Sequence, residues 1–217
     1  MMRLVFLGPP GVGKGTQAEF VAKELKIPHY STGDIFRKIL KDSSSLSKEL
    51  AKFVNTGELV PDDIVFETLK ETLFTSKANN NGWVLDGYPR NKAQAEMLDN
   101  LLANNNEKID YAIYLSADRE ILAQRLSSRR VCSKCDTIYN LAMNPPKREG
   151  ICDKCRGKLI QRKDDKIETV LKRIFIFEKE FFPLKEYYES RGILLVINGE
   201  GTTKEVFNQI KKGLNLG

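Results

Sequence analysis

The sequence predicts an α/β protein in which a parallel β-sheet is covered on both faces by helices. Short runs rich in β-branched and aromatic residues alternate with segments of helical hydrophobic periodicity, as expected when crossover helices join parallel strands. The strand candidates are almost unbroken apolar runs, which is typical of strands buried on both faces. At 217 residues the chain can bury a substantial core, in one domain with insertions or in two small domains.

The predicted elements follow one another from the first residues onward. Strands are expected at residues 4–7, 27–30, 83–85, 111–115 and 193–197, of which 27–30 is the weakest candidate. Helices are expected near residues 14–25, 61–77, 90–104, 118–129 and 166–190. The last helix has six apolar residues at helical spacing, which we expect to face the core: Ile167, Val170, Leu171, Ile174, Phe177 and Phe181. Pro183 is expected to kink or split this helix.

Two segments interrupt the alternation. Residues 31–60 read as short helices with no strand between them, and residues 131–160 lose apolar periodicity while gaining Cys, Pro and Gly. Both are predicted to be insertions at the binding edge of the sheet. We therefore divide the chain into a core of residues 1–30, 61–127 and 162–217, a helical insertion of residues 31–60, and a cysteine-containing insertion of residues 128–161.

A glycine-rich turn directly follows the first apolar run and leads into the first helix. It reads Gly8-Pro9-Pro10-Gly11-Val12-Gly13-Lys14-Gly15-Thr16. In such a turn the backbone N–H groups converge on an anion, the helix N-terminus favours negative charge, and Lys14 supplies a mobile cation. Gly15 stands where Ser or Thr usually binds magnesium, and Thr16 follows one residue later. Strand, spacing, lysine and helix together favour a phosphate-binding loop over a turn without a ligand.

The four cysteines form two pairs in the second insertion, Cys132-x2-Cys135 and Cys152-x2-Cys155, with sixteen residues between the pairs. Two such knuckles can bring four thiolates to a tetrahedral zinc ion. With four sulfurs no coordination position stays open, so the predicted zinc site is structural. Disulfides and four unrelated thiols are the alternatives, which the paired spacing and an intracellular setting disfavour.

Composition narrows the partners. Apolar residues make up 41% of the chain and charged residues 29%, with both signs mixed, which excludes a disordered protein. The net charge of +6 suits nucleic acid, a membrane surface or a phosphate-rich small ligand. Few aromatics accompany the densest basic cluster, at residues 125–130, which disfavours nucleic acid. The apolar runs are too short for a signal peptide or a membrane span, so we expect a cytoplasmic protein without a membrane partner.

Five motifs occur in the same order as in a known family: residues 8–16, 31–34, 57–62, 85–90 and 162–165. With them the chain resembles the adenylate kinases over essentially its whole length, in the long-lid form whose lid carries a zinc site. The resemblance implies a P-loop three-layer α/β/α fold with a five-stranded parallel sheet, an AMP-binding insertion at residues 31–60 and a zinc-binding lid at residues 128–161. It also implies a monomer that transfers the γ-phosphoryl group of MgATP to AMP, giving two ADP.

Such a reaction requires two polyanions to be brought into line, their charge to be neutralised, and water to be kept out. The resemblance assigns donor (ATP) binding to Gly11, Val12, Gly13, Lys14, Gly15, Thr16, Arg125 and Arg129. It assigns catalysis to Lys14, Asp86, Arg90, Arg129, Arg162 and Arg173. Asp86 would hold a water ligand of Mg²⁺, and its alternative interpretation is a helix cap or turn residue. Asp164 and Asp165 would orient the arginines or the lid hinge.

On the acceptor side, the resemblance assigns AMP binding to Thr32, Gly33, Arg37, Gly57, Leu59, Val60, Gly87, Arg90, Gln94, Arg162 and Arg173. The Gln94 amide both donates and accepts, which suits the N6/N1 edge of adenine, but turned round it would suit guanine. No role is assigned to Arg130. The single histidine, His29, is expected to be a packed strand-end residue, neither catalytic nor a metal ligand.

Three other functions are compared with this one. The first is a kinase of the same fold acting on CMP, UMP or GMP; the position of Gln94 and the long lid that the resemblance implies disfavour the two pyrimidine acceptors. A GTP-dependent switch would need Ser or Thr directly after Lys14 and an Asn-Lys-x-Asp segment, and the sequence has neither. A zinc-ribbon module that binds nucleic acid is disfavoured by the number of separate phosphate-directed motifs.

Overall fold

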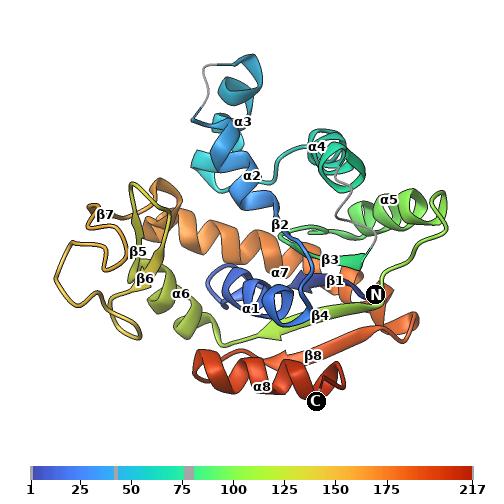
Figure 1. Ribbon diagram of the computed structural model, residues 1–217. Coiled ribbons are helices and arrows are strands. Elements are labelled where there is room, and N and C mark those ends of the chain that lie inside the picture. The colour runs from blue at the N-terminus through green and yellow to red at the C-terminus, as the bar shows by residue number, and fades with distance from the viewer. Residues whose placement is uncertain (1, 42–43, 76–80, 217) are drawn as a thin grey trace.

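The main sheet of the computed structural model has five parallel strands. The structure describes residues 2–41, 44–75 and 81–216. The strands are β1 (Met2–Leu7), β2 (His29–Ser31), β3 (Gly82–Asp86), β4 (Tyr111–Ser116) and β8 (Leu194–Asn198). Their order across the sheet is β2-β3-β1-β4-β8, and every neighbouring pair is parallel. The predicted parallel sheet is thereby confirmed (Figure 1).

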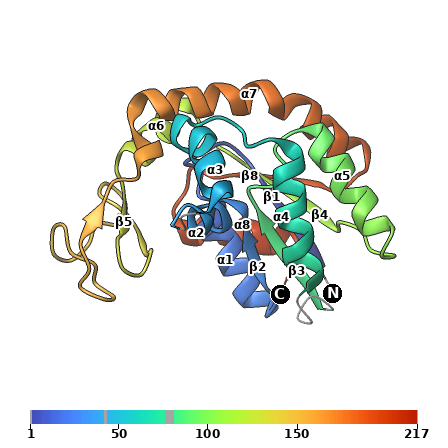
Figure 2. The same cartoon turned by 90° about the horizontal axis from the view of Figure 1, so that it is seen from above.

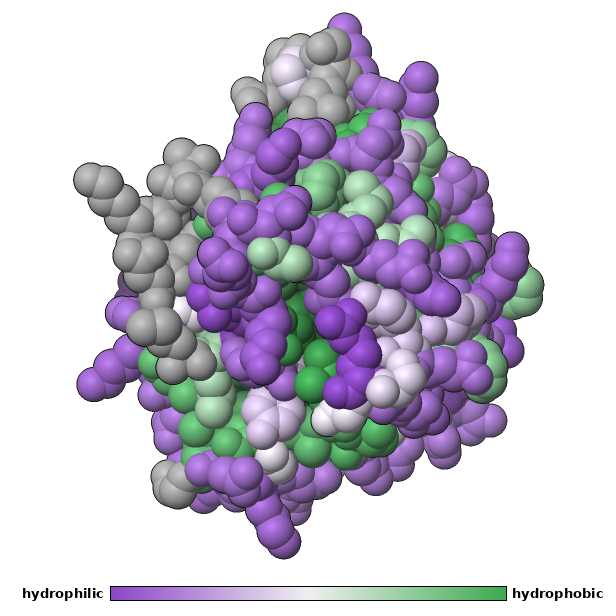
Figure 3. Space-filling model, turned by 90° about the vertical axis from the view of Figure 1, so that its right-hand side faces the viewer, coloured by the Kyte–Doolittle hydropathy of each residue, from purple (hydrophilic) through white to green (hydrophobic). Residues whose placement is uncertain are grey.

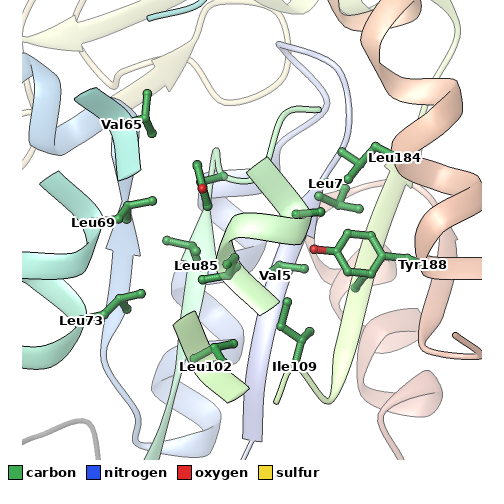
Figure 4. Packing of buried hydrophobic residues seen from close by; sticks show 14 of the residues in the cluster. Val5, Leu7, Val65, Leu69, Leu73, Leu85, Leu102, Ile109, Leu184 and Tyr188 are labelled. Atoms are coloured by element: carbon green, nitrogen blue, oxygen red, sulfur yellow. The ribbon is translucent and has the colours of Figure 1, made fainter. Parts of the chain in front are cut away.

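Helices cover both faces of the sheet because successive strand residues point to opposite sides. Val5 and Leu7 belong to one hydrophobic cluster, whereas Leu4 and Phe6 belong to the other. The first cluster packs against α4 (Asp62–Thr75), α5 (Lys92–Ala103) and the C-terminal half of α7 (Ile167–Ser190). The second packs against α1 (Lys14–Leu25), α6 (Arg119–Ser127), α8 (Thr203–Gly213) and the start of α7. Figure 4 shows α4 presenting Val65, Leu69 and Leu73 in one row towards Leu85 of the sheet.

Two sequence predictions for helix α7, the alternative of a split at Pro183 and the burial of its apolar residues, can be compared with the structure. The helix continues through Pro183 as one helix of 24 residues, so the proline does not split it. Phe181 and Leu184, on either side of the proline, are buried in the core, and this packing offsets the hydrogen bond that proline cannot donate. Ile167 and Leu171 were expected in the core but are 48% and 42% exposed, because they lie on the outward flank of the helix.

The edge strand β2 lies slightly further along the chain than predicted. It pairs His29 with Val84 and Ser31 with Asp86, so it ends beside the end of β3. His29 is partly buried at the start of this strand. The predicted helix at residues 61–77 is described as far as Thr75, and its last two residues lie outside the described residues. The shift brings Ser31 and Asp86 to the same carboxyl edge of the sheet.

Both predicted insertions project from this core: the helical one rises above it in Figure 1, and the cysteine-containing one extends to the side in Figure 2. The first contains α2 (Thr32–Ile39) and α3 (Ser45–Thr56), with Ser31 and Ser44 accepting hydrogen bonds as helix N-caps. The second contains β5 (Arg129–Cys132), β6 (Ile138–Asn140) and β7 (Leu159–Ile160), which form a small antiparallel sheet, followed by a 3-10 turn, η2 (Lys163–Asp165). These lid strands have two to four residues, too few for hydrophobic periodicity to reveal them.

The surface carries hydrophilic side chains interspersed with smaller hydrophobic patches, as the face in Figure 3 shows. Among the helices that the structure describes, none combines the length and the apolar character that crossing a membrane requires.

Candidate active site

The glycine-rich turn leaves the first amides of α1 available to an anion. Gly13 has a left-handed backbone conformation with φ of 101°, and the helix begins at the next residue, Lys14. No described side chain caps this helix, which is also true of α6 and α7, whereas α2, α3, α5 and α8 are capped. The unpaired N–H groups and the helix dipole therefore favour negative charge at this turn.

The Lys14 ammonium folds back onto the same turn. Its Nζ donates hydrogen bonds to the carbonyl oxygens of Gly8 at 2.6 Å and Pro9 at 2.9 Å. Burial lowers the pKa of Lys14 to about 8, and the neighbouring carboxylate of Asp86 only partly offsets this effect. Two carbonyl groups are weak partners for a half-buried cation, so a phosphate placed beside the turn would bind it more strongly.

Asp86 occupies the end of β3, against the turn. It is buried, and its Oδ1 has no hydrogen-bond partner among the described residues. Its Oδ2 lies 3.2 Å from the position that a Cβ at Gly15 would take, so a larger residue there would crowd the carboxylate. The helix cap of α5 is Asn91 and not Asp86. A buried carboxylate oxygen without a partner, next to a phosphate loop and Thr16, is the donor type that Mg²⁺ or its water ligands use.

Two carboxylates of η2 hold two of the predicted phosphate clamps. Arg129 donates to Asp165 through two of its guanidinium nitrogens, with Nε at 2.7 Å from Oδ2 and Nη2 on Oδ1. Arg173 donates to Oδ2 of Asp164 at 2.8 Å and to its backbone oxygen at 3.1 Å. Asp165 is completely buried, whereas both arginines remain partly accessible. The expectation that Asp164 and Asp165 orient arginines agrees with these contacts.

Burial also perturbs the cations around the cleft. Burial, together with nearby arginines, lowers the pKa of Arg90 and of Arg162 to about 10. The pKa of Arg173 is likewise lowered, first by burial, although Asp164 counteracts this. These guanidinium groups stay charged at neutral pH, but burial away from solvent and the neighbouring cations make the charge of each unfavourable. A polyanion that enters this site therefore stabilises these cations.

Arg125 lies on the wall between the turn and the end of β8. Its guanidinium donates to the backbone oxygens of Gly199 at 2.7 Å and Glu200 at 2.8 Å. These bonds fix the guanidinium plane beside the cavity that adjoins the turn. A fixed guanidinium plane can stack on a flat heterocycle. The unassigned Arg130 bonds to the backbone oxygens of Ser127 and Arg129, so it supports the start of the lid.

The helical insertion forms the opposite side of the cleft. Arg37 pairs with Asp34 at 2.5 Å, within the cavity that the turn also lines. Gly57 has φ of +74°, and a Cβ there would lie only 2.8 Å from Cγ of Arg173. Only glycine therefore allows the end of α3 to approach α7 so closely. Gln94 is buried with 1% exposure at the end of a small cavity that Thr32, Leu59 and Val60 also line.

All of the predicted nucleotide-site residues line three adjoining cavities that share lining residues. The cavity next to the turn takes Gly11, Val12, Gly13, Lys14, Gly15, Thr16, Asp86, Arg125, Arg129, Arg162 and Arg173. The cavity beneath the helical insertion takes Gly33, Arg37, Gly57, Leu59, Val60, Gly87 and Arg90. Thr32 and Gln94 line the third. Residues from six separate segments thus converge on one cleft.

Sequence reasoning missed two residues that support Gln94 in the cleft and one residue that supports the cysteine pairs. Asp62 accepts a hydrogen bond from Gln94 Nε2 at 2.6 Å, and Asn91 caps the helix that carries Gln94. Tyr139 donates to Cys152 Sγ at 3.5 Å and accepts from the N–H of Asp153 at 2.8 Å. Asp62 is the last residue of one of the five motifs, and Asn91 directly follows another. Their proximity to these motifs was the only sign in the sequence that they belong to the site. Nothing in the sequence pairs Tyr139 with Cys152.

The four cysteines come together at one end of the lid. Their sulfurs lie within 4.8 Å of one another, and Cys132 and Cys152 are fully buried. The separations are 3.3 Å for Cys132 and Cys155, 3.6 Å for Cys135 and Cys152, and 3.2 Å for Cys135 and Cys155. Four thiolates around one tetrahedral zinc ion lie about 3.8 Å apart, given a Zn–S distance of about 2.3 Å. The cysteines form no disulfide, so the cluster fits a four-thiolate metal centre.

Comparison with known proteins places the chain in one family. The family model described as adenylate kinase matches residues 6–193. An adenylate kinase of Caldanaerobacter subterraneus subsp. tengcongensis is 46% identical, with 98% of this chain and 96% of its own length covered. Those of Thermoanaerobacter pseudethanolicus and Clostridium tetani are 45% and 43% identical, with 98% of each chain covered. These matches cover nearly the whole chain, and the cleft and the cysteine cluster are consistent with them. The protein therefore belongs to the adenylate kinase family, the phosphotransferases that convert ATP and AMP into two ADP.

Proposed function

We propose that this adenylate kinase transfers the γ-phosphoryl group of MgATP to AMP by positioning the two nucleotides and neutralising their charge, with lid closure over both. The observation that carries this proposal is the convergence of Lys14 and six arginines on one cleft, together with an uncapped helix N-terminus. Little covalent chemistry is needed for phosphoryl transfer, so a cleft of positioned cations supplies what the reaction requires.

The donor nucleotide is assigned to the cavity beside the turn. The amides of residues 11–16 and Lys14 would bind its phosphates, and the fixed plane of Arg125 would stack on its adenine. Asp86 and Thr16 would hold Mg²⁺ or its water ligands, since Asp86 Oδ1 is buried and has no hydrogen-bond partner within the described part of the chain. Bound there, Mg²⁺ would neutralise charge on the phosphate oxygens.

The acceptor nucleotide is assigned to the cavities beneath the helical insertion. Arg37 and Arg90 would bind its phosphate, and Thr32, Gly87 and Gln94 would border its base with Leu59 and Val60. Arg129, Arg162 and Arg173 would clamp the phosphates between the two nucleotides. Before the nucleotides bind, Asp165 holds Arg129 in place and Asp164 holds Arg173 in place. These contacts limit the side-chain entropy that the arginines lose when the phosphates bind. The monomeric state expected from the resemblance stays a prediction.

The cysteine cluster is proposed to hold a structural Zn²⁺. The buried hydrophobic core of the lid consists of Cys132, Tyr139, Cys152 and Leu159, so apolar burial alone supplies little folding free energy there. A four-thiolate zinc site would supply the rest. Tyr139, which donates to one sulfur, would fix the orientation of that ligand.

Removing the metal is therefore expected to loosen the lid while the core stays folded. After chelation, amide hydrogen exchange in residues 129–160 should accelerate about tenfold or more, whereas exchange in β1, β3 and β4 should stay unchanged. Restoring zinc should restore protection. Unchanged exchange in the lid after demonstrated loss of metal would contradict a structural role.

The proposed reaction is tested with a panel of acceptors. Phosphoryl transfer from MgATP to AMP, GMP, CMP and UMP is measured by nucleoside diphosphate formation. We expect rapid turnover with AMP and slow or absent turnover with the other three. Faster turnover with another monophosphate would retain the donor site but overturn the acceptor assignment.

A further inference from the structure

The side-chain amide of Gln94 is held at both of its ends. Its Oε1 accepts a hydrogen bond from the backbone N–H of Arg90 at 2.7 Å. Its Nε2 donates to Oδ1 of Asp62 at 2.6 Å. Gln94 is 1% exposed, so water competes little with either bond. An amide buried in this way keeps the orientation that its two partners require.

The chemistry of the two partners permits only one orientation. A carboxylate only accepts hydrogen bonds, so the amide NH2 group must face Asp62. A backbone N–H only donates, so the amide oxygen must face Arg90. Turning the amide round would set oxygen against carboxylate and N–H against N–H, leaving two buried pairs unsatisfied. The sequence alone leaves the amide free to suit adenine or guanine, and these contacts remove that freedom.

Asp62 is itself held in position by its surroundings. It is the first residue of α4, and Nδ2 of Asn91 donates to both of its carboxylate oxygens, at 3.3 and 3.2 Å. Asn91 Oδ1 in turn accepts the backbone N–H of Gln94 at 2.8 Å. The start of α4 and the start of α5 are thus joined through one carboxylate. Gln94 lines the small acceptor cavity, and this carboxylate bonds its amide nitrogen.

We infer that Asp62 is a specificity-positioning residue, which orients Gln94 so that the acceptor site selects 6-aminopurine over 6-oxopurine monophosphates. Two bonds leave the amide with one hydrogen and one oxygen lone pair. Adenine offers an acceptor at N1 and a donor at N6, which match these groups. Hypoxanthine and guanine offer a donor at N1 and an acceptor at O6, which oppose them. The inference rests on the proposed function, in which Gln94 contacts the acceptor base.

The test compares AMP with IMP, whose bases differ at this edge alone. For the wild type and for Asp62→Ala, the dissociation constants of both nucleotides and kcat/KM for both are measured. We expect Asp62→Ala to lower the preference for AMP over IMP by at least about tenfold. A factor of ten corresponds to about 1.4 kcal/mol of binding free energy. The change should appear in KM and in the dissociation constants, with kcat for AMP within about threefold of the wild type.

Three variants complete the design. Asp63→Ala removes a carboxylate from the same first turn of α4, at an exposed position, and should leave the AMP/IMP ratio unchanged. Asp62→Asn retains an oxygen that can accept from Gln94 and should keep more of the ratio than Asp62→Ala. Gln94→Leu should abolish most of the ratio.

The outcomes separate two failures. If Gln94→Leu lowers the ratio but Asp62→Ala does not, the positioning role is overturned and the base contact stands. If Gln94→Leu also leaves the ratio unchanged, the proposed base contact itself is wrong. If Asp63→Ala lowers the ratio as much as Asp62→Ala, the effect comes from the helix terminus and the inference fails.

Discussion

Replacing Lys14 by alanine is expected to lower kcat for phosphoryl transfer by about 10²–10³-fold, the usual cost of removing one group that stabilises charge in the transition state. Lys14 is the cation of the glycine-rich turn, and its two hydrogen bonds go to carbonyl groups of that same turn. Its loss should not unfold the protein, because burial lowers its pKa and the buried charge therefore opposes folding. Initial rates at saturating ATP and AMP measure the effect, and thermal unfolding checks the fold.

Lys23→Ala is the matched control. Lys23 lies on the same helix, where it forms an exposed ion pair with Glu19. The Lys23→Ala substitution removes the same charge at a position outside the cleft, so kcat should stay within about twofold of the wild type. Retention of more than a tenth of wild-type kcat in Lys14→Ala would show that the helix amides and arginines bind the phosphates without the lysine.

Asp165→Asn is expected to lower the free energy of unfolding by about 3 kcal/mol, because breaking a buried ion pair leaves a buried charge without compensation. Asp165 is completely buried, and Arg129 contacts both of its carboxylate oxygens. For a chain of this size, such a loss corresponds to a melting temperature lower by about 6–12 °C. Thermal unfolding of the two proteins at pH 7 measures it.

The control for charge alone is Glu24→Gln. Glu24 pairs with Lys211 at the surface between α1 and α8, and its side chain is 42% exposed. Removing this exposed pair should cost no more than about 0.5 kcal/mol. Equal destabilisation by the two substitutions would mean that Arg129 gains no more from Asp165 than a surface pair provides.

The core of the fold could be predicted from the sequence because its signals are local. Four of the five strands are apolar runs in the region predicted, and the helices between them show the expected spacing. Helix α7 shows where this reasoning fails. Ile167 and Leu171 have core-like spacing but lie on an exposed flank, because the position of the neighbouring elements, and not the spacing, decides which flank is covered.

The candidate site was predictable in its parts, since the turn and the cysteine knuckles carry their chemistry in the local sequence. The partners that orient these parts were not. Arg129 and Asp165 are 36 residues apart, and Gln94 and Asp62 are 32 residues apart. Carboxylates and amides of this kind occur throughout any soluble chain, so only the fold singles out the two that meet a functional side chain.

The small antiparallel sheet of the lid makes this part of the chain exchangeable. The lid begins on β5 and ends on β7, and these strands pair directly, Val131 with Ile160 and Cys132 with Leu159. Entry and exit are therefore adjacent, so a lid of different length could be grafted between them without moving α6 or α7. Arg129 precedes Val131 and Asp165 follows Ile160, so this ion pair flanks the paired residues and would survive an exchange of the chain between them. Evolution or design can thus vary how the cleft is covered while the Arg129–Asp165 pair stays constant.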